Sequence, residues 1–179
     1  MLREVRRSDS ESLFPQLSTD EVTRFLIPPP PSIEGFDRFI GWALDQRVAG
    51  LGATFAITVK GCAEAIGLIQ IRNLPVGSRT AEWGFAIGSS FWGTGIFEDA
   101  ARLALAFAFD RMEVHRLEAR TAVSNGRGNG VLVKLGAVLE GTLRGSFIQD
   151  GHHVDQAIYS ILVSDWRPVQ RLALTGLVH

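Results

Sequence analysis

The chain has 179 residues, with 18 Lys and Arg against 19 Asp and Glu, so its formal net charge is −1. This balance gives no electrostatic reason to expect a nucleic-acid or anionic-membrane partner. The length fits a single domain, no apolar run is long enough to predict a membrane span, and one cysteine, Cys62, excludes an internal disulfide framework. With a charged N-terminus that lacks a signal-peptide pattern, the sequence predicts a soluble cytoplasmic protein without a metal site.

The first third of the chain predicts helices between short strands. Residues 2–7 alternate as a strand, and residues 8–10 are typical caps of a following helix. Ser32 predicts the start of a second helix with Phe36, Phe39, Ile40, Ala43 and Leu44 on one side. Residues 53–59 and 65–71 then predict two strands, and the Lys60-Gly61 turn between them favours an antiparallel hairpin.

The centre of the chain predicts a strand, a glycine-rich turn and an amphipathic helix. Residues 82–88 are typical of a buried strand, Trp92-Gly93-Thr94-Gly95 breaks the pattern, and a helix begins at Ile96. Such a turn exposes backbone N–H groups at the positive end of a helix dipole, which favours phosphate; an ordinary bend with no ligand is the alternative. No Gly-Lys-Ser/Thr follows the turn, and Glu98 stands where a dinucleotide fingerprint needs its third glycine. Nucleotide hydrolysis is therefore not expected.

The remaining elements predict an α+β sheet with helices on both faces. A strand over 114–123 is followed by a helix that opens at Ser124-Asn125 and stops at Gly136. Two final strands, 137–143 and 153–163, are joined by a turn at 149–151.

Two segments together resemble the GCN5-related N-acetyltransferases. They read FWGTGIFEDAARLALAFAFDRMEVHRLEAR and SNGRGNGVLVKLGAVLEGTLR. The resemblance is strongest from Ala81 to Trp166 and is closest to the RimJ/RimL branch, which acetylates the N-termini of ribosomal proteins. It implies one acetyltransferase domain over 1–179, with 167–179 as a C-terminal tail. The implied fold is a mixed, mostly antiparallel seven-stranded sheet with helices on both faces and splayed central parallel strands.

The resemblance also implies which residues hold acetyl-CoA. The pantetheine would lie between the splayed strands, and the pyrophosphate would lie on the glycine-rich turn. Two positions depart from the usual motif: Trp92 replaces Gln or Arg, and Phe97 replaces Gly or Ala. Glu98 and Asp99 are expected on the outer face of the helix, paired with Arg102. The implied cofactor-binding residues are Phe85, Ala86, Ile87, Trp92, Gly93, Thr94, Gly95, Ile96, Phe97 and Asn125.

Acetyl transfer to an amine needs a base, directly or through water. Glu82 is the first candidate because related enzymes often carry a carboxylate on the strand that lines the cofactor; a cross-strand ion pair with Arg116 or Arg120 is the alternative role. Glu118 on the neighbouring strand is the second candidate base. The serine or tyrosine that many relatives use as the acid is missing, because Gly128 stands at the matching serine position.

Three functions remain open from the sequence. The first is acetyl-CoA-dependent acetylation of a protein or peptide N-terminal amine, and the second is acetylation of a small amine such as an amino acid, a polyamine or an antibiotic. The third is a non-catalytic acyl-CoA-binding regulatory module, which the departures at Phe97 and Gly128 suggest. Leucines 172, 174 and 177 in the C-terminal tail suggest a homodimer contact.

Overall fold

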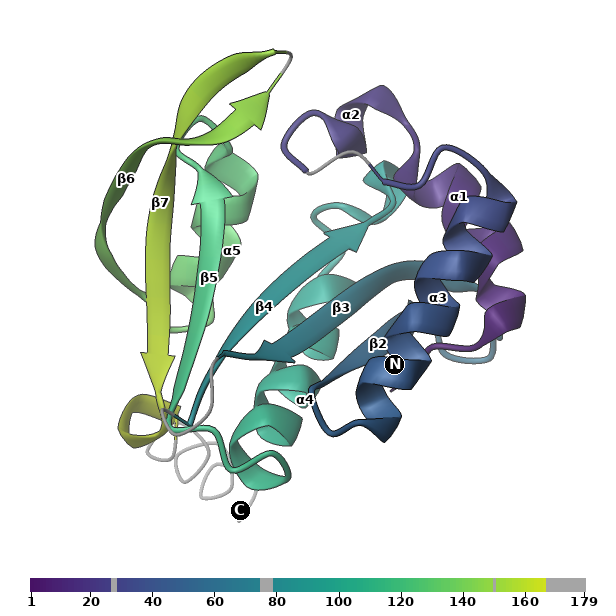
Figure 1. The fold of residues 1–179 in the computed structure, drawn as a ribbon, viewed down its shortest axis with the longest axis horizontal. Coiled ribbons are helices and arrows are strands. Elements are labelled where there is room, and N and C mark those ends of the chain that lie inside the picture. The colour runs from purple at the N-terminus through teal and green to yellow at the C-terminus, as the bar shows by residue number, and fades with distance from the viewer. Residues whose placement is uncertain (27–28, 75–78, 150, 167–179) are drawn as a thin grey trace.

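A computed structural model describes residues 1–26, 29–74, 79–149 and 151–166. Seven strands form one sheet in the order β1-β2-β3-β4-β5-β7-β6 (Figure 1). The seven-stranded sheet itself is the one that the family resemblance implies. The strands are β1 (Leu2–Glu4), β2 (Gly52–Thr58), β3 (Ala65–Asn73), β4 (Thr80–Ile87), β5 (Arg116–Ala122), β6 (Val138–Gln149) and β7 (His152–Leu162). The helices are α1 (Ser10–Leu17), α2 (Asp20–Thr23), α3 (Ile33–Val48), α4 (Ile96–Asp110) and α5 (Gly126–Lys134), with 3-10 turns η1 (Arg7–Asp9) and η2 (Ser89–Phe91).

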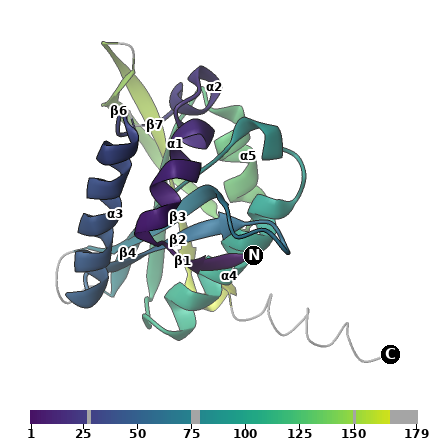
Figure 2. The ribbon, with the colours of Figure 1, turned by 90° about the vertical axis from the view of Figure 1, so that its right-hand side faces the viewer.

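The helices cover both faces of the sheet, each with its own core. In Figure 2, α1 and α3 lie on one side of the strands, and α4 and α5 lie on the other. The α4 side buries alanines and Leu105 against the β2–β5 strands, and small alanine side chains allow close approach of the helix to the sheet. The α1–α3 side buries Leu13, Phe36 and Ile40. Ser32 caps α3 as expected, because its side chain accepts a hydrogen bond from the Gly35 N–H at 3.1 Å.

The two halves of the sheet meet at one short parallel joint. Strands β1 to β4 pair antiparallel, as do β5, β7 and β6, whereas β4 and β5 run parallel. Only residues 80–82 of β4 pair with residues 116–118 of β5. Beyond this joint the two strands diverge, so the sheet opens like a V (Figure 1). This is the splayed parallel pair that the resemblance implies.

The terminal strands differ in length from the prediction. Strand β1 ends at Glu4 rather than at residue 7, because η1 begins at Arg7. Strand β6 continues to Gln149 rather than ending at residue 143. Gly141 and Gly145 resemble turn residues in the sequence, but they lie at two register shifts inside the β6–β7 ladder, where a bulge absorbs extra residues without ending the strand.

The C-terminal tail predicted over 167–179 lies outside the described residues. Within the described part of the chain, none of the helices combines the length and the apolar character that crossing a membrane requires.

Candidate active site

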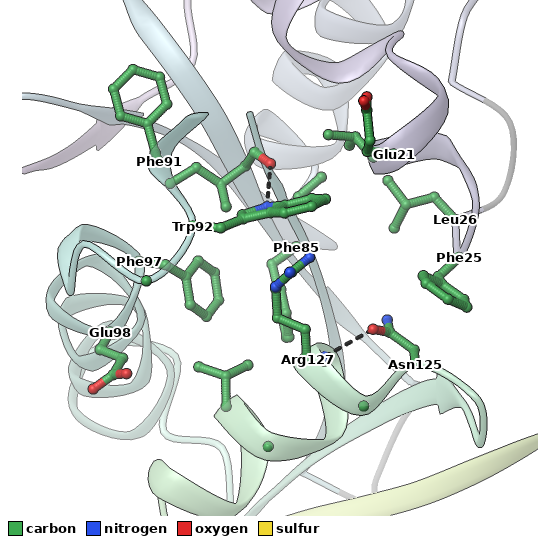
Figure 3. Close-up of a pocket in the computed structure, with 18 of the residues that line it drawn as sticks. Glu21, Phe25, Leu26, Phe85, Phe91, Trp92, Phe97, Glu98, Asn125 and Arg127 are labelled. Carbon is green, nitrogen blue, oxygen red and sulfur yellow. Dashed lines mark hydrogen bonds between the residues drawn. The ribbon is translucent and has the colours of Figure 1, made fainter. Parts of the chain in front are cut away.

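A cavity of about 360 Å³ lies at the open end of the gap between β4 and β5. Its volume falls in the usual range for small-molecule sites. Four segments line it: the α2 region, the end of β4, the turn into α4, and the start of α5 (Figure 3). Eight of the ten expected cofactor-binding residues are among the lining residues, namely Phe85, Ala86, Ile87, Trp92, Gly93, Gly95, Phe97 and Asn125.

The turn between β4 and α4 is built for close approach to its backbone. Gly93 and Gly95 have φ angles of +75° and +82°, a region that L side chains rarely adopt. The Thr94 hydroxyl is not at the cavity wall; it donates a hydrogen bond to the Phe91 carbonyl at 2.7 Å and so braces the turn. Ile96 does not line the cavity either, and packs against the sheet core. The first N–H groups of α4 lack intrahelical partners, so this turn can bind an anion.

Phe97 contributes its side chain to the cavity wall. Its ring lies 4.5 Å from that of Phe85, centroid to centroid, and the Phe85 ring lies 5.0 Å from that of Trp83. The two phenylalanines therefore form one apolar wall beneath the turn. The larger residue at position 97 fills the space that a Gly or Ala would leave beside Phe85.

The β4 backbone presents alternate residues to the gap. The Gly88 N–H donates a hydrogen bond to the Ile66 carbonyl of β3 at 2.9 Å. In an antiparallel ladder every second residue of a strand bonds to the same neighbouring strand, and the residues between them face the other way. Ala86 therefore directs its backbone N–H and C=O groups at β3 and not at the gap. Phe85 and Ile87 direct theirs at the gap, where the Ile87 carbonyl accepts a hydrogen bond from Trp92 Nε1 at 3.1 Å.

Asn125 begins α5 as its N-cap. Its Oδ1 accepts a hydrogen bond from the Gly128 N–H at 2.9 Å. A Cβ atom on Gly128 would come within 2.6 Å of Asn125 Nδ2 and 2.9 Å of Thr121 Oγ1. The side chains of Asn125 and Thr121 thus crowd the position that a Cβ atom of residue 128 would occupy.

Glu82 lies at the β4–β5 joint and does not line the cavity. It is paired across the joint with Glu118, the last residue pair before the strands diverge. Its Oε2 accepts a hydrogen bond from Arg72 at 2.7 Å, and its Oε1 lies 3.7 Å from Arg120 Nε. Arg120 Nη2 is also 4.0 Å from Glu118 Oε2, so one guanidinium lies between two carboxylates. The expected pairing of Glu82 with Arg120 is present, and Arg72 is an additional partner.

The charged row continues from Glu118 onto β7 and β6. Arg116 donates to Glu118 at 2.8 Å and, through its Nη1, to Glu140 at 2.7 Å. Hydrogen bonds from Arg116 and then from Ser160 lower the pKa of Glu140 from 4.5 to about 2. The bond to Glu140 raises the pKa of Arg116 above its usual value. Arg116 and Glu140 therefore form an ion pair at neutral pH within the half of the sheet made by β5, β7 and β6, and the Arg120–Glu82 pair reaches across the joint to β4.

The position of Glu98 corrects one prediction. Glu98 lines the cavity instead of lying on the outer face of α4, and it pairs with Lys134 of α5 at 3.1 Å rather than with Arg102. The reason is that α5 packs beside the start of α4, which local spacing does not reveal. The carboxylate that would repel a bound anion is thereby paired with a cation.

The α2 region supplies lining residues that sequence reasoning did not single out. They are Glu21, Val22, Phe25 and Leu26. The spacing of a four-residue helix does not indicate which side chains face the gap. In the described ranges, no three His, Cys, Asp or Glu side chains lie close enough together to hold a metal ion.

Comparison with known proteins adds independent findings. A family model described as an acetyltransferase (GNAT) domain matches residues 1–138. A putative ribosomal N-acetyltransferase of Bacillus subtilis, YdaF, is 34% identical over 100 residues, which span 56% of this chain and 55% of that protein. A second N-acetyltransferase of the same organism, YoaA, uncharacterized, is 29% identical over 90% of this chain and 92% of its own length. The structure of Mycobacterium smegmatis RimJ in complex with CoA-disulfide matches with a TM-score of 0.86 at 24% identity, covering 98% of this chain and 88% of that chain.

Proposed function

Because this chain belongs to the GNAT acetyltransferase family, and is therefore an N-acetyltransferase that uses acetyl-CoA, we propose that it acetylates the N-terminal amine of a protein or peptide. The relative YdaF, whose name is putative ribosomal N-acetyltransferase, supports this choice of acceptor; the matched part covers 55% of that protein.

The observation that carries the proposal is the chemistry of the cavity wall at α2. Glu21 contributes one carboxylate there, and Val22, Phe25 and Leu26 contribute apolar surface. One carboxylate balances one ammonium, and the apolar surface suits the first side chain of a peptide. A polyamine carries several cations and calls for several carboxylates. The other acidic residue among the described lining residues, Glu98, is already paired with Lys134.

We propose that acetyl-CoA binds along this cavity with its pyrophosphate and pantetheine parts. We assign the pyrophosphate to the N–H groups of the Gly93–Phe97 turn, and the pantetheine amides to the gap-facing backbone of Phe85 and Ile87 and the Asn125 amide. Acetyl-CoA supplies the activated acetyl thioester. The apolar wall of Phe85 and Phe97 would exclude water beside the pantetheine arm.

We propose Glu82 as the base, acting through a water molecule because its side chain is not at the cavity wall. Its place at the joint, where β4 and β5 part, puts it at the closed end of the gap. A gap-facing N–H of β4 would polarise the acetyl carbonyl. Gly128 offers no acid, so solvent would protonate the departing thiolate, which is a tolerable leaving group near neutral pH. Glu118 remains the second candidate base.

The test is thiol release from acetyl-CoA with three acceptor sets: peptides that differ in their first residue, spermidine, and free amino acids. We expect turnover with peptides. In Glu21→Gln, the KM for peptide should rise, with acetyl-CoA affinity unchanged. Asp20→Asn is the matched control, because Asp20 neighbours Glu21 without lining the cavity. Turnover with spermidine alone would overturn the peptide acceptor, and binding without any turnover would favour the regulatory module.

Two broader expectations belong to this proposal. The exposed free thiol of Cys62 is compatible with a reducing cytoplasm, which we propose as the location. A homodimer that uses the leucines of the 167–179 tail is tested by light scattering of the full chain and of a chain ending at Trp166.

A further inference from the structure

One contact crosses the cavity from wall to wall. Arg127, in the first turn of α5, places its guanidinium carbon 3.8 Å from the ring centroid of Trp92, which follows η2 on the β4 side (Figure 3). Both side chains line the cavity. This cation–π contact therefore joins the two halves of the open sheet at the level of the anion-binding turn.

Hydrogen bonds fix the indole of Trp92 and the backbone at Arg127. The indole of Trp92 is fixed by its hydrogen bond from Nε1 to the Ile87 carbonyl at 3.1 Å. The backbone that carries Arg127 is fixed by the Asn125 cap on Gly128. No carboxylate in the described part of the chain forms an ion pair with Arg127, whereas Glu98 and Lys134, in the same cavity, neutralise each other. Arg127 is thus an unneutralised cation beside a site for anions.

We propose that Arg127 is a specificity-determining residue that exchanges the face of Trp92 for a phosphate group of acetyl-CoA. This inference rests on the placement of the cofactor proposed above. A guanidinium forms bidentate, charge-assisted hydrogen bonds with phosphate, which are stronger than its contact with an indole. The exchange also moves the guanidinium out of the path between the two walls, where the pantetheine arm must run. Arg127 would therefore select thioesters that carry phosphate over those that do not.

The exchange predicts opposite effects on two ligands. In Arg127→Ala, acetyl-CoA loses a charge-assisted contact, and its Kd should rise about tenfold. S-acetyl-pantetheine, which has no phosphate, needs no such contact and no longer has to displace the guanidinium. Its Kd should stay unchanged or fall up to about fivefold. Arg127→Lys keeps the charge without the planar fork and should be intermediate for acetyl-CoA.

Isothermal titration calorimetry of both ligands with the intact protein and with Arg127→Ala tests the proposal. Arg102→Ala is the matched control, because Arg102 is exposed on α4 and does not line the cavity. Tryptophan fluorescence gives a second readout: acetyl-CoA should change the emission of the intact protein, and the change should be lost in Trp92→Phe and reduced in Arg127→Ala.

Equal losses of affinity for the two ligands in Arg127→Ala would mean a structural role and would overturn the proposal. Unchanged affinity for both ligands would also overturn the proposal, because it would mean that Arg127 does not contact the phosphate. If the intact protein failed to bind acetyl-CoA, the placement of the cofactor would fall, and this inference with it. Loss of acetyl-CoA affinity alone, with thermal stability retained, is the expected result.

Discussion

Replacing Gly128 by alanine tests the tight packing at the start of α5. The added Cβ would lie 2.6 Å from Asn125 Nδ2, closer than real Cβ contacts, so the asparagine amide has to move. That movement breaks the cap bond from the Gly128 N–H to Asn125 Oδ1, now 2.9 Å long. Gly130 offers a matched control in the same helix, because a Cβ there meets no atom within 4 Å.

Both substitutions gain the same helix propensity, which raises the free energy of unfolding, but only Gly128→Ala also loses the cap, which lowers it. Alanine is about 1 kcal/mol better than glycine inside a helix, at either position. Loss of an N-cap costs about 1 kcal/mol, with a range of about 0.5–2, and the 2.9 Å contact with Thr121 Oγ1 adds to it. We therefore expect Gly130→Ala to stabilise the fold and Gly128→Ala to leave it unchanged or weaker. The difference in the free energy of unfolding between the two variants should be about 1–2 kcal/mol, which corresponds to about 2–8 °C in Tm.

Urea denaturation of the two variants and the unsubstituted protein at one pH measures the gap directly. Equal stability of Gly128→Ala and Gly130→Ala would refute the crowding inferred from the Cβ distances. Gly128→Ser should behave like Gly128→Ala and should not raise turnover, because the site has no room for a serine in the position of an acid.

Three further predictions concern the anion-binding turn, the base and the charged row. Gly95→Asp places a carboxylate on the phosphate site and should abolish acetyl-CoA binding in calorimetry. Gly95→Asn has the same size and backbone strain without the charge, so it should keep part of the binding. Unchanged binding in the aspartate variant would show that the turn is not part of the site. Glu82→Gln should lower kcat with little effect on acetyl-CoA affinity, and a rate loss confined to Glu118→Gln would move the base to β5. Because the pKa of Glu140 is lowered on folding, its carboxylate stabilises the fold above about pH 4.5, and this contribution disappears as the pH falls towards about 2. Glu140→Gln should therefore be less stable than the parent by about 1 kcal/mol at pH 7, after allowance for solvent screening of its exposed pair with Arg116. This difference in stability should shrink as the pH falls towards about 2; a difference that did not depend on pH in urea denaturation would contradict this account.

The parts of the fold that local chemistry determines were predictable from the sequence. The start of α4 at Ile96 follows from glycines that break the strand pattern and apolar residues at helical spacing. The Ser32 and Asn125 caps likewise depend on residues three positions away. The seven-stranded sheet with a parallel central pair was expected only from the family resemblance, because the pairing of β4 with β5 joins segments more than thirty residues apart.

The parts that depend on packing between distant segments were not predictable. Glu98 finds its partner at Lys134, thirty-six residues along the chain, and helical spacing suggested Arg102 instead. The α2 residues line the same cavity as residues of β4 and α5, which lie far from them along the chain. Gly141 and Gly145 mark bulges here, and the same residues in another context would mark a turn.

The short joint between β4 and β5 has a mechanical consequence. Three residue pairs and a row of partly exposed charges connect two halves that each have their own extensive strand pairing. Dissolved ions screen partly exposed charges far more than they affect buried apolar contacts. Raising the ionic strength should therefore weaken the charged part of this joint more than it weakens the apolar cores on either face of the sheet.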